Sequence, residues 1–201
     1  MKKHLIIIAT CATLALLTVR GFASAVSPTS ITDSGAPFDL TSGWDFNLAQ
    51  SYLVTALDFY DSGAVGGLLT SHQVGLWTST GTLLASATIP AGTAAPLIGT
   101  YRSVAIVPIV LTPGFYEVGG FVPGNSDKYV FDAAAFTTLS GITYSASHVA
   151  TGAFAFPGSQ NLVSTREFTA NFEVAGAPEP ASAALLGLGA LLLAARRRRG
   201  A

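Results

Sequence analysis

The sequence predicts an all-β protein, an antiparallel β-sandwich or jelly roll, flanked by an N-terminal signal helix and a short C-terminal transmembrane helix. Two observations predict the sandwich: the middle of the chain alternates apolar and polar residues in short segments separated by turn formers, and no long segment there has apolar residues at helical spacing. A third observation predicts the flanking helices, because each end of the chain carries basic residues beside an unbroken apolar run.

The N-terminal residues 1–25 have the three parts of a secretory signal peptide. Two lysines precede an apolar run at residues 5–19, and the small residues Ala-Ser-Ala at 23–25 form a cleavage site. We therefore expect the Sec translocon to export the chain and signal peptidase to cut between Ala25 and Val26.

Residues 26–177 form the expected extracellular domain, at about 150 residues the usual size of a single domain. Roughly eight strands at this spacing are typical of a sandwich or jelly roll. The clearest segments are GWDFNL (43–48), YLVTALDFYD (52–61), HQVGLWT (72–78), TLLASATI (82–89), YRSVAIVPIVL (101–111), FYEVGGF (115–121) and EFTANFEV (167–174).

Alternation within these segments predicts which side chains share a face. Gly81 should form the hairpin turn after Trp77, Pro108 indicates an edge strand or a bulge, and residues 132–139 fit either a helical turn or a loop. The sets expected on one face are Trp44, Phe46 and Leu48; Leu53, Thr55, Leu57 and Phe59; and Phe168, Ala170, Phe172 and Val174.

The predicted domain is strongly acidic. Its three cations are Arg102, Lys128 and Arg166, against ten aspartates and glutamates, so three minus ten gives a formal net charge of −7. A surface of this charge repels phosphate backbones and anionic lipid, so we expect the domain to bind neither nucleic acid nor a membrane surface.

The C-terminal residues 178–201 combine three features. Pro178, Glu179 and Pro180 prevent regular helix and keep the chain extended. Residues 181–195 are apolar or small, and as a helix they would measure about 22 Å against a hydrocarbon core of about 30 Å. Such a segment can halt translocation, with the basic cluster on the cytoplasmic side: Arg196, Arg197, Arg198 and Arg199.

This order of motif, short apolar helix and terminal arginines resembles the PEP-CTERM sorting signal of Gram-negative bacteria. The resemblance implies processing by an exosortase, an integral-membrane cysteine protease or transpeptidase, in species that make extracellular polysaccharide. It implies an inner-membrane-anchored precursor, held through residues 181–195, and a mature form at the cell surface, in the outer envelope or secreted. An ordinary C-terminal anchor would have a longer span and no need of the Pro-Glu-Pro.

The middle of the chain has a second, narrower resemblance. Residues 71–92, SHQVGLWTSTGTLLASATIPAG, and residues 101–120, YRSVAIVPIVLTPGFYEVGG, resemble an uncharacterised extracellular β-sandwich found in many such proteins. This resemblance implies a fold and brings no activity with it.

Few residues suggest chemistry. The two serine–histidine neighbours, Ser71–His72 and Ser147–His148, should point to opposite faces of a strand, so we expect no enzyme activity. The one cysteine, Cys11, lies in the signal segment, which excludes thiol chemistry in the exported chain. We expect no metal and no cofactor. Three residues could contribute to a calcium site, but a solvated turn explains them better: Asn125, Asp127 and Asp132.

Two classes of function therefore remain. The first is a structural or adhesive protein of the cell surface or of the exopolysaccharide and biofilm matrix. The second is a carbohydrate-binding module with extracellular polysaccharide as its partner. Trp44 belongs to a buried stripe, whereas Trp77 faces away from Val74 and Leu76 and is the best candidate for exposed stacking on a sugar.

Overall fold

The computed structural model describes residues 22–160 and 165–175 of the 201-residue chain, all within one compact unit. The signal helix, the sorting motif at Pro178, Glu179 and Pro180, the apolar segment 181–195 and the arginine cluster lie outside the described residues. Within those residues the structure contains no helix long and apolar enough to cross a bilayer.

Thirteen strands make up the described domain, more than the sequence indicates because several are very short. They are β1 (Phe22–Ser24), β2 (Val26–Gly35), β3 (Leu40–Leu48), β4 (Tyr52–Tyr60), β5 (His72–Thr78), β6 (Leu83–Ile89), β7 (Leu97–Ile98), β8 (Tyr101–Leu111), β9 (Gly114–Val122), β10 (Lys128–Thr138), β11 (Ile142–Thr151), β12 (Ser159–Gln160) and β13 (Ala170–Ala175).

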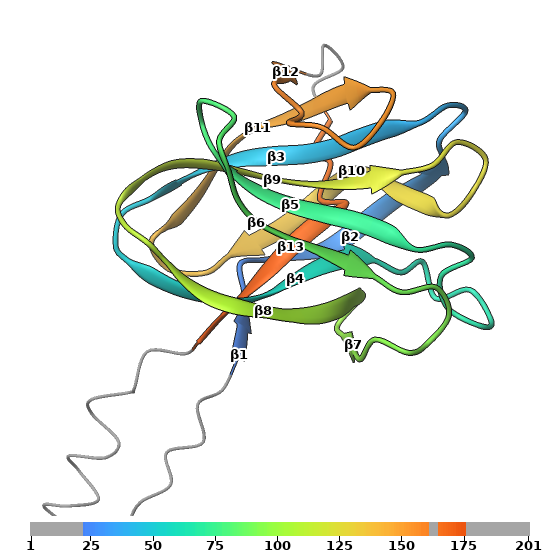
Figure 1. Cartoon of the computed structure of the whole chain (residues 1–201), viewed down its shortest axis with the longest axis horizontal. Coiled ribbons are helices and arrows are strands. Elements are labelled where there is room, and N and C mark those ends of the chain that lie inside the picture. The colour runs from blue at the N-terminus through green and yellow to red at the C-terminus, as the bar shows by residue number, and fades with distance from the viewer. Residues whose placement is uncertain (1–21, 161–164, 176–201) are drawn as a thin grey trace, which may run out of the picture. The chain divides into compact units, whose positions relative to one another are not determined.

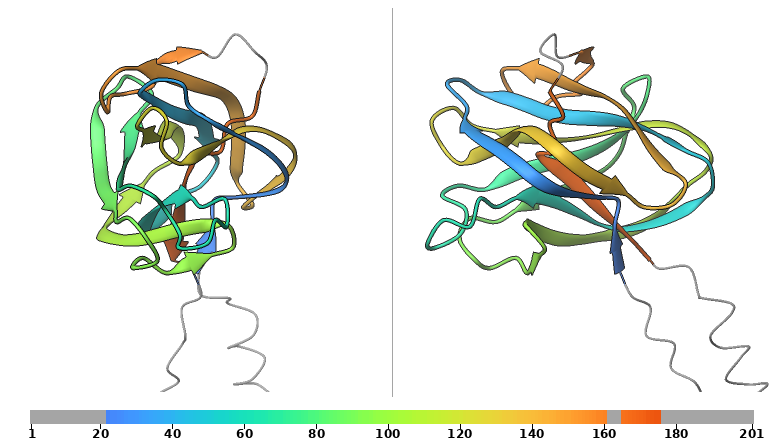
Figure 2. Two further views of the ribbon diagram at one scale, coloured as in Figure 1. Left: turned by 90° about the vertical axis from the view of Figure 1, so that its right-hand side faces the viewer. Right: turned by 180° about the vertical axis from the view of Figure 1, so that it is seen from behind.

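The strands form two facing antiparallel sheets and a separate ribbon (Figure 1). The five-stranded sheet has the order β1-β13-β4-β8-β7, and the six-stranded sheet the order β12-β11-β3-β9-β5-β6. The ribbon, β2 with β10, lies beside them, as Figure 2 shows from behind. Phe136 of the ribbon contacts Tyr144 of the six-stranded sheet at 5.5 Å and Phe168, just before β13, at 4.8 Å between ring centroids. The prediction of an antiparallel β-sandwich is confirmed for this domain.

Aromatic rings fill the space between the two sheets. Trp44 on β3 is fully buried, and its ring stacks on that of Phe172 on β13 at a centroid distance of 6.2 Å. Phe46 lies 5.0 Å from the same Phe172 ring. The predicted buried faces of β3 and of the segment leading into β13 are therefore confirmed, as is Gly81, whose φ of 87° closes the β5–β6 hairpin.

Three local predictions have different outcomes. Pro108 lies in a bulge, because β4 pairs with Ile109 and then with Ala105. The same irregularity falls at Thr55 on β4, and there it changes which residues point into the core. Leu57 and Phe59 are buried as predicted. Before the bulge, Val54 is buried in place of Leu53 and Thr55. The segment 132–139 is neither a helical turn nor a loop, since most of it belongs to strand β10.

Gly120 on β9 allows the two sheets to approach closely. A Cβ at this position would lie 2.8 Å from Cδ2 of Phe59, whose buried ring is held against His72 at 3.8 Å. We expect Gly120→Ala to lower the free energy of unfolding by about 1–3 kcal/mol through overpacking. Gly35→Ala is the control, because no atom lies within 4 Å of its added Cβ. Urea unfolding of both variants tests this, and equal midpoints would contradict the packing described.

Candidate functional site

The outer face of the six-stranded sheet brings together the side chains best suited to recognition. Trp77 pairs with Glu117 across β5 and β9, and Glu117 pairs with Asp45 across β9 and β3, so these three side chains share one face. The next row on that face holds three glycines and His148 of β11, in the order Gly75, Gly119, Gly43 and His148. An aromatic ring, carboxyl groups and an imidazole thus lie over a floor of glycines.

Trp77 is not exposed, and the prediction that it would be is wrong. Its side chain does face away from Val74 and Leu76, but only 3% of the residue is accessible. The rings of Phe154 and Phe156, in the segment 152–158 after β11, lie 5.4 and 6.1 Å from it. Alternation along a strand predicts the face of a residue and carries no information about a distant loop that covers that face.

The glycine floor explains why this covering segment fits so closely. A Cβ at Gly75 would overlap the ring of Trp77, which lies flat across that position. Pro157 covers the next two glycines, since its Cγ would lie 3.0 Å from a Cβ at either Gly43 or Gly119. The segment 152–158 therefore occupies the space that side chains would otherwise fill.

Glu117 is the most perturbed group of this face. It is 1% exposed, its Oε2 lies 3.2 Å from Nδ1 of His148, and its Oε1 has no hydrogen-bond partner among the described residues. Burial raises the pKa of Glu117 to about 7, although His148 acts in the opposite direction. At neutral pH this carboxyl group can therefore both donate and accept a hydrogen bond.

The raised pKa of Glu117 makes stability depend on pH. Because the folded-state value of about 7 exceeds the ordinary value of 4.5, the uncharged form favours folding at acid pH and this contribution is lost as pH rises from about 4.5 to 7. Glutamine cannot ionise, so Glu117→Gln should not lose this contribution. We expect the free energy of unfolding of Glu117→Gln, relative to that of the wild type, to rise by up to about 3 kcal/mol from pH 4.5 to pH 7.5. Urea unfolding at the two pH values measures the difference; the same difference at both would contradict the assignment.

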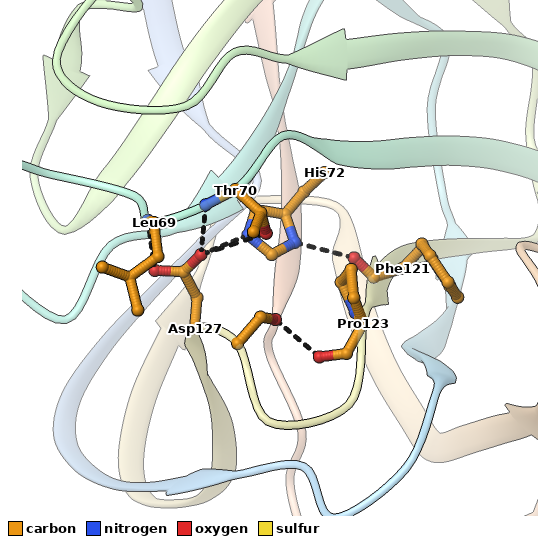
Figure 3. A network of polar contacts seen from close by, with 7 residues as sticks. Leu69, Thr70, His72, Phe121, Pro123 and Asp127 are labelled. Carbon is orange, nitrogen blue, oxygen red and sulfur yellow. Dashed lines mark hydrogen bonds and ion pairs between the residues drawn. The ribbon is translucent and has the colours of Figure 1, made fainter.

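A second polar network closes one end of the sandwich (Figure 3). His72 is fully buried, with Nδ1 2.9 Å from the carbonyl oxygen of Phe121 and Nε2 2.8 Å from Oδ2 of Asp127. Both ring nitrogens therefore lie within hydrogen-bond distance of an oxygen atom. The Leu69 and Thr70 amides donate to the same carboxylate at 2.8 and 3.0 Å.

This network is structural, and it joins the loop before β5 to the loop before β10. Burial opposes ionisation of Asp127, but the Leu69 amide, His72 and the Thr70 amide together hold the pKa of Asp127 below its usual value. No local pattern could have predicted the pair, because 55 positions separate its members.

The residues considered for calcium and for nucleophilic catalysis have other contacts. Asp127 is held by the His72 network, and Asp132 accepts a hydrogen bond from the Arg166 amide at 3.1 Å. Within the described residues, no three acidic, histidine or cysteine side chains are grouped to hold a metal ion. Ser147 accepts a hydrogen bond from the Glu167 amide at 2.7 Å, and Ser71 is exposed.

The chain belongs to a family described as a domain of unknown function, DUF4082, whose model matches residues 25–174. No curated protein matches the chain. Among solved structures, it is similar to a family 35 carbohydrate binding module from an environmental isolate, at 14% identity and a TM-score of 0.33; the match covers 64% of this chain and 94% of that one.

Proposed function

We propose that this member of the DUF4082 family is an exported, non-enzymatic protein of the cell surface or of the exopolysaccharide matrix. A signal peptide delivers it, and an exosortase-type membrane protease processes it through a PEP-CTERM tail. The observation that carries the proposal is the order of segments along the chain: basic start, apolar run and small residues, then the sandwich, then Pro178, Glu179 and Pro180, an apolar segment and four arginines.

The distribution of charge also fits a matrix protein. Six of the ten acidic residues of the domain are buried, so fewer than half of its carboxyl groups lie at the surface: Asp58, Asp61, Glu117, Asp127, Glu167 and Glu173. Each of the three cations pairs with an acid, at 2.7 Å for Arg102, 2.9 Å for Lys128 and 3.5 Å for Arg166. The surface formed by the described residues offers no basic patch to nucleic acid.

Processing is tested in the native host. The proposal predicts that the chain matures in cells that contain the exosortase and accumulates in the inner membrane as a precursor when the exosortase gene is deleted. Fractionation with immunoblotting reads this out. Normal maturation in the deletion strain would contradict the proposed processing while leaving export intact.

Carbohydrate binding is the second candidate function, favoured by the grouping of Trp77, Glu117 and His148 on the outer face of the six-stranded sheet. Because Phe154 and Phe156 cover this grouping, a sugar could stack on Trp77 only after the segment 152–158 moves. Glu117 would then supply hydrogen bonds from a partly desolvated carboxyl group.

Pull-down with the extracellular polysaccharide of the host separates the two candidates. A binding module should be retained, and Glu117→Gln should reduce its retention at least about tenfold, the effect of one lost hydrogen bond to a charged group. The control is Asp39→Asn, at an exposed acid whose amide can still accept from the Gly124 N–H. Absence of retention, or equal retention of all three proteins, would count against a binding site at this face.

A further inference from the structure

Two acidic side chains lie buried on the outer face of the five-stranded sheet, near strand β1. Asp58 on β4 is fully buried and Glu173 on β13 is 1% exposed. Asn171 pairs with Asp58 and lies two residues before Glu173, so all three side chains share one face. Phe172, between the two β13 residues, points the other way, into the core.

Few hydrogen-bond donors reach these two carboxyl groups. Both carboxyl oxygens of Asp58 and Oε2 of Glu173 have no hydrogen-bond partner among the described residues. The Ser24 hydroxyl of β1 donates to Oε1 of Glu173. The other groups that face Asp58 are Ser103 and Tyr101 of β8, and neither is a cation.

An acid pair with no cation beside it is unstable as two anions. Burial raises the pKa of Asp58 to about 8; Ser103 opposes the shift and Glu173 adds to it. Burial likewise raises the pKa of Glu173, against the effects of Ser24 and Asp58. A cation beside the pair would remove this penalty.

The backbone nitrogen of Val26 is held by Asn171, the residue that shares a face with both acids. Its N–H donates to Oδ1 of Asn171 at 3.2 Å, and Nδ2 of Asn171 donates back to the Val26 carbonyl oxygen at 2.9 Å. A cavity of about 110 Å³ adjoins it, with Ser24, Val26 and Tyr101 in its wall. Val26 is also the residue at which the sequence predicts that the exported chain begins.

Cleavage there would create a cation at the nitrogen that Asn171 holds, on the face of the sheet that carries the two acids. Hydrolysis adds one water across the Ala25–Val26 peptide bond, so Ala25 leaves with a carboxylate and Val26 keeps an α-ammonium group. The same cut removes the whole of β1, which pairs with β13, and with Ser24 it removes the hydroxyl donor of Glu173. The ammonium has three N–H donors, one for Asn171 and two for the carboxylates.

We propose that Asp58 and Glu173 form a binding site for the α-ammonium group of the mature N-terminus at Val26. Removal of the signal peptide then completes the charge balance of the fold by exchanging a serine donor for an ammonium. Because Ala25 is fully buried and its N–H donates to Phe172 at 2.9 Å, cleavage must precede folding. The proposal rests on the export step of the proposed function and goes beyond it.

The exported protein contains its own internal reference for the test. After the predicted cut, Lys128 is the only lysine in the chain, so the Val26 amine and Nζ of Lys128 are its two amines. Lys128 is 55% exposed. The experiment is reductive methylation with ¹³C-formaldehyde of the protein purified from exporting cells, across a pH series, with both amines resolved by NMR.

The direction of the pKa shift separates an ion pair from simple burial. An acid pair raises the pKa of an amine, whereas burial alone lowers it. We expect the labelling midpoint of Val26 to lie at least about one pH unit above the ordinary value near 8, and to fall by at least that amount in the double variant Asp58→Asn/Glu173→Gln. Asp39→Asn, at a distant exposed acid, should leave it unchanged.

A wild-type midpoint at or below about 8 would overturn the proposal even if the double variant failed to fold, since the wild-type value alone decides it. A mature chain that begins at a residue other than Val26 would overturn it as well. In both cases export itself would stand. A chain that retains the whole signal segment would contradict the ammonium site and the proposed export together.

Discussion

Replacement of Trp44 by alanine is expected to lower the free energy of unfolding by about 3–5 kcal/mol, out of the roughly 5–15 kcal/mol that stabilises a typical domain. Trp44 is fully buried, and its ring contacts those of Phe46, Phe168 and Phe172 at centroid distances of 5.0, 5.4 and 6.2 Å. Its Nε1 also donates to the carbonyl oxygen of Ala170 at 2.8 Å. The substitution therefore removes both packing and a hydrogen bond that joins the two sheets.

Two further variants make this prediction specific. Trp44→Phe keeps most of the apolar contact but leaves the Ala170 carbonyl unpaired, so it should cost about 1–3 kcal/mol. Phe115→Ala removes an aromatic side chain that is 58% exposed and should change stability by no more than about 0.5 kcal/mol. Equal urea midpoints for Trp44→Ala and Phe115→Ala would show that the inter-sheet core is not where the structure has it.

Replacement of Glu179 by alanine is expected to abolish C-terminal processing while leaving export intact. If the membrane protease reads Pro178, Glu179 and Pro180, the precursor should accumulate in the inner membrane. Ala181→Ser, a small change beside the motif, is the matched control and should mature normally. Processing of Glu179→Ala at the wild-type rate in the native host would count against recognition through this glutamate.

The arginine cluster should act in a different way. Each arginine costs about 2.5–3.5 kcal/mol to bring to the bilayer centre. Replacement of all four by glutamine should therefore weaken the stop-transfer signal and allow the C-terminal tail to cross the membrane. The quadruple variant is therefore expected in the soluble exported fraction with its tail intact, in contrast to the membrane-bound Glu179→Ala precursor. Identical fractionation of the two variants would contradict separate roles for motif and cluster.

Regular strands were predictable from the sequence. β3 pairs with β9 in unbroken register from Leu40 to Leu48, so simple alternation correctly assigns Trp44, Phe46 and Leu48 to the core. On β4 the bulge at Thr55 changes the phase, so the same rule holds for Leu57 and Phe59, which are buried, and fails for Leu53 and Thr55. The Ala-rich segment 132–139 shows a related failure, because pairing with β2 overrides its weak local preference for a strand.

The polar clusters were not predictable, because their members are far apart in the chain. His72 contacts Asp127, and Glu117 contacts His148. Asp58 and Glu173 lie on β4 and β13, which are far apart in the sequence. Alternation placed Trp77 on the correct face but could not predict its cover at 152–158. Sequence patterns therefore indicated the faces of the sheets, whereas the contacts made on those faces depend on tertiary structure.

Intact-mass analysis of the protein recovered from its native host tests the central proposal most directly, because one spectrum reports both processed ends. We expect a chain that begins at Val26 and ends upstream of Arg196, Arg197, Arg198 and Arg199, with any group added by the protease visible as extra mass. A mature protein that still carries the arginine cluster would contradict processing through the C-terminal tail, and one that still begins at Met1 would contradict export by signal-peptide cleavage.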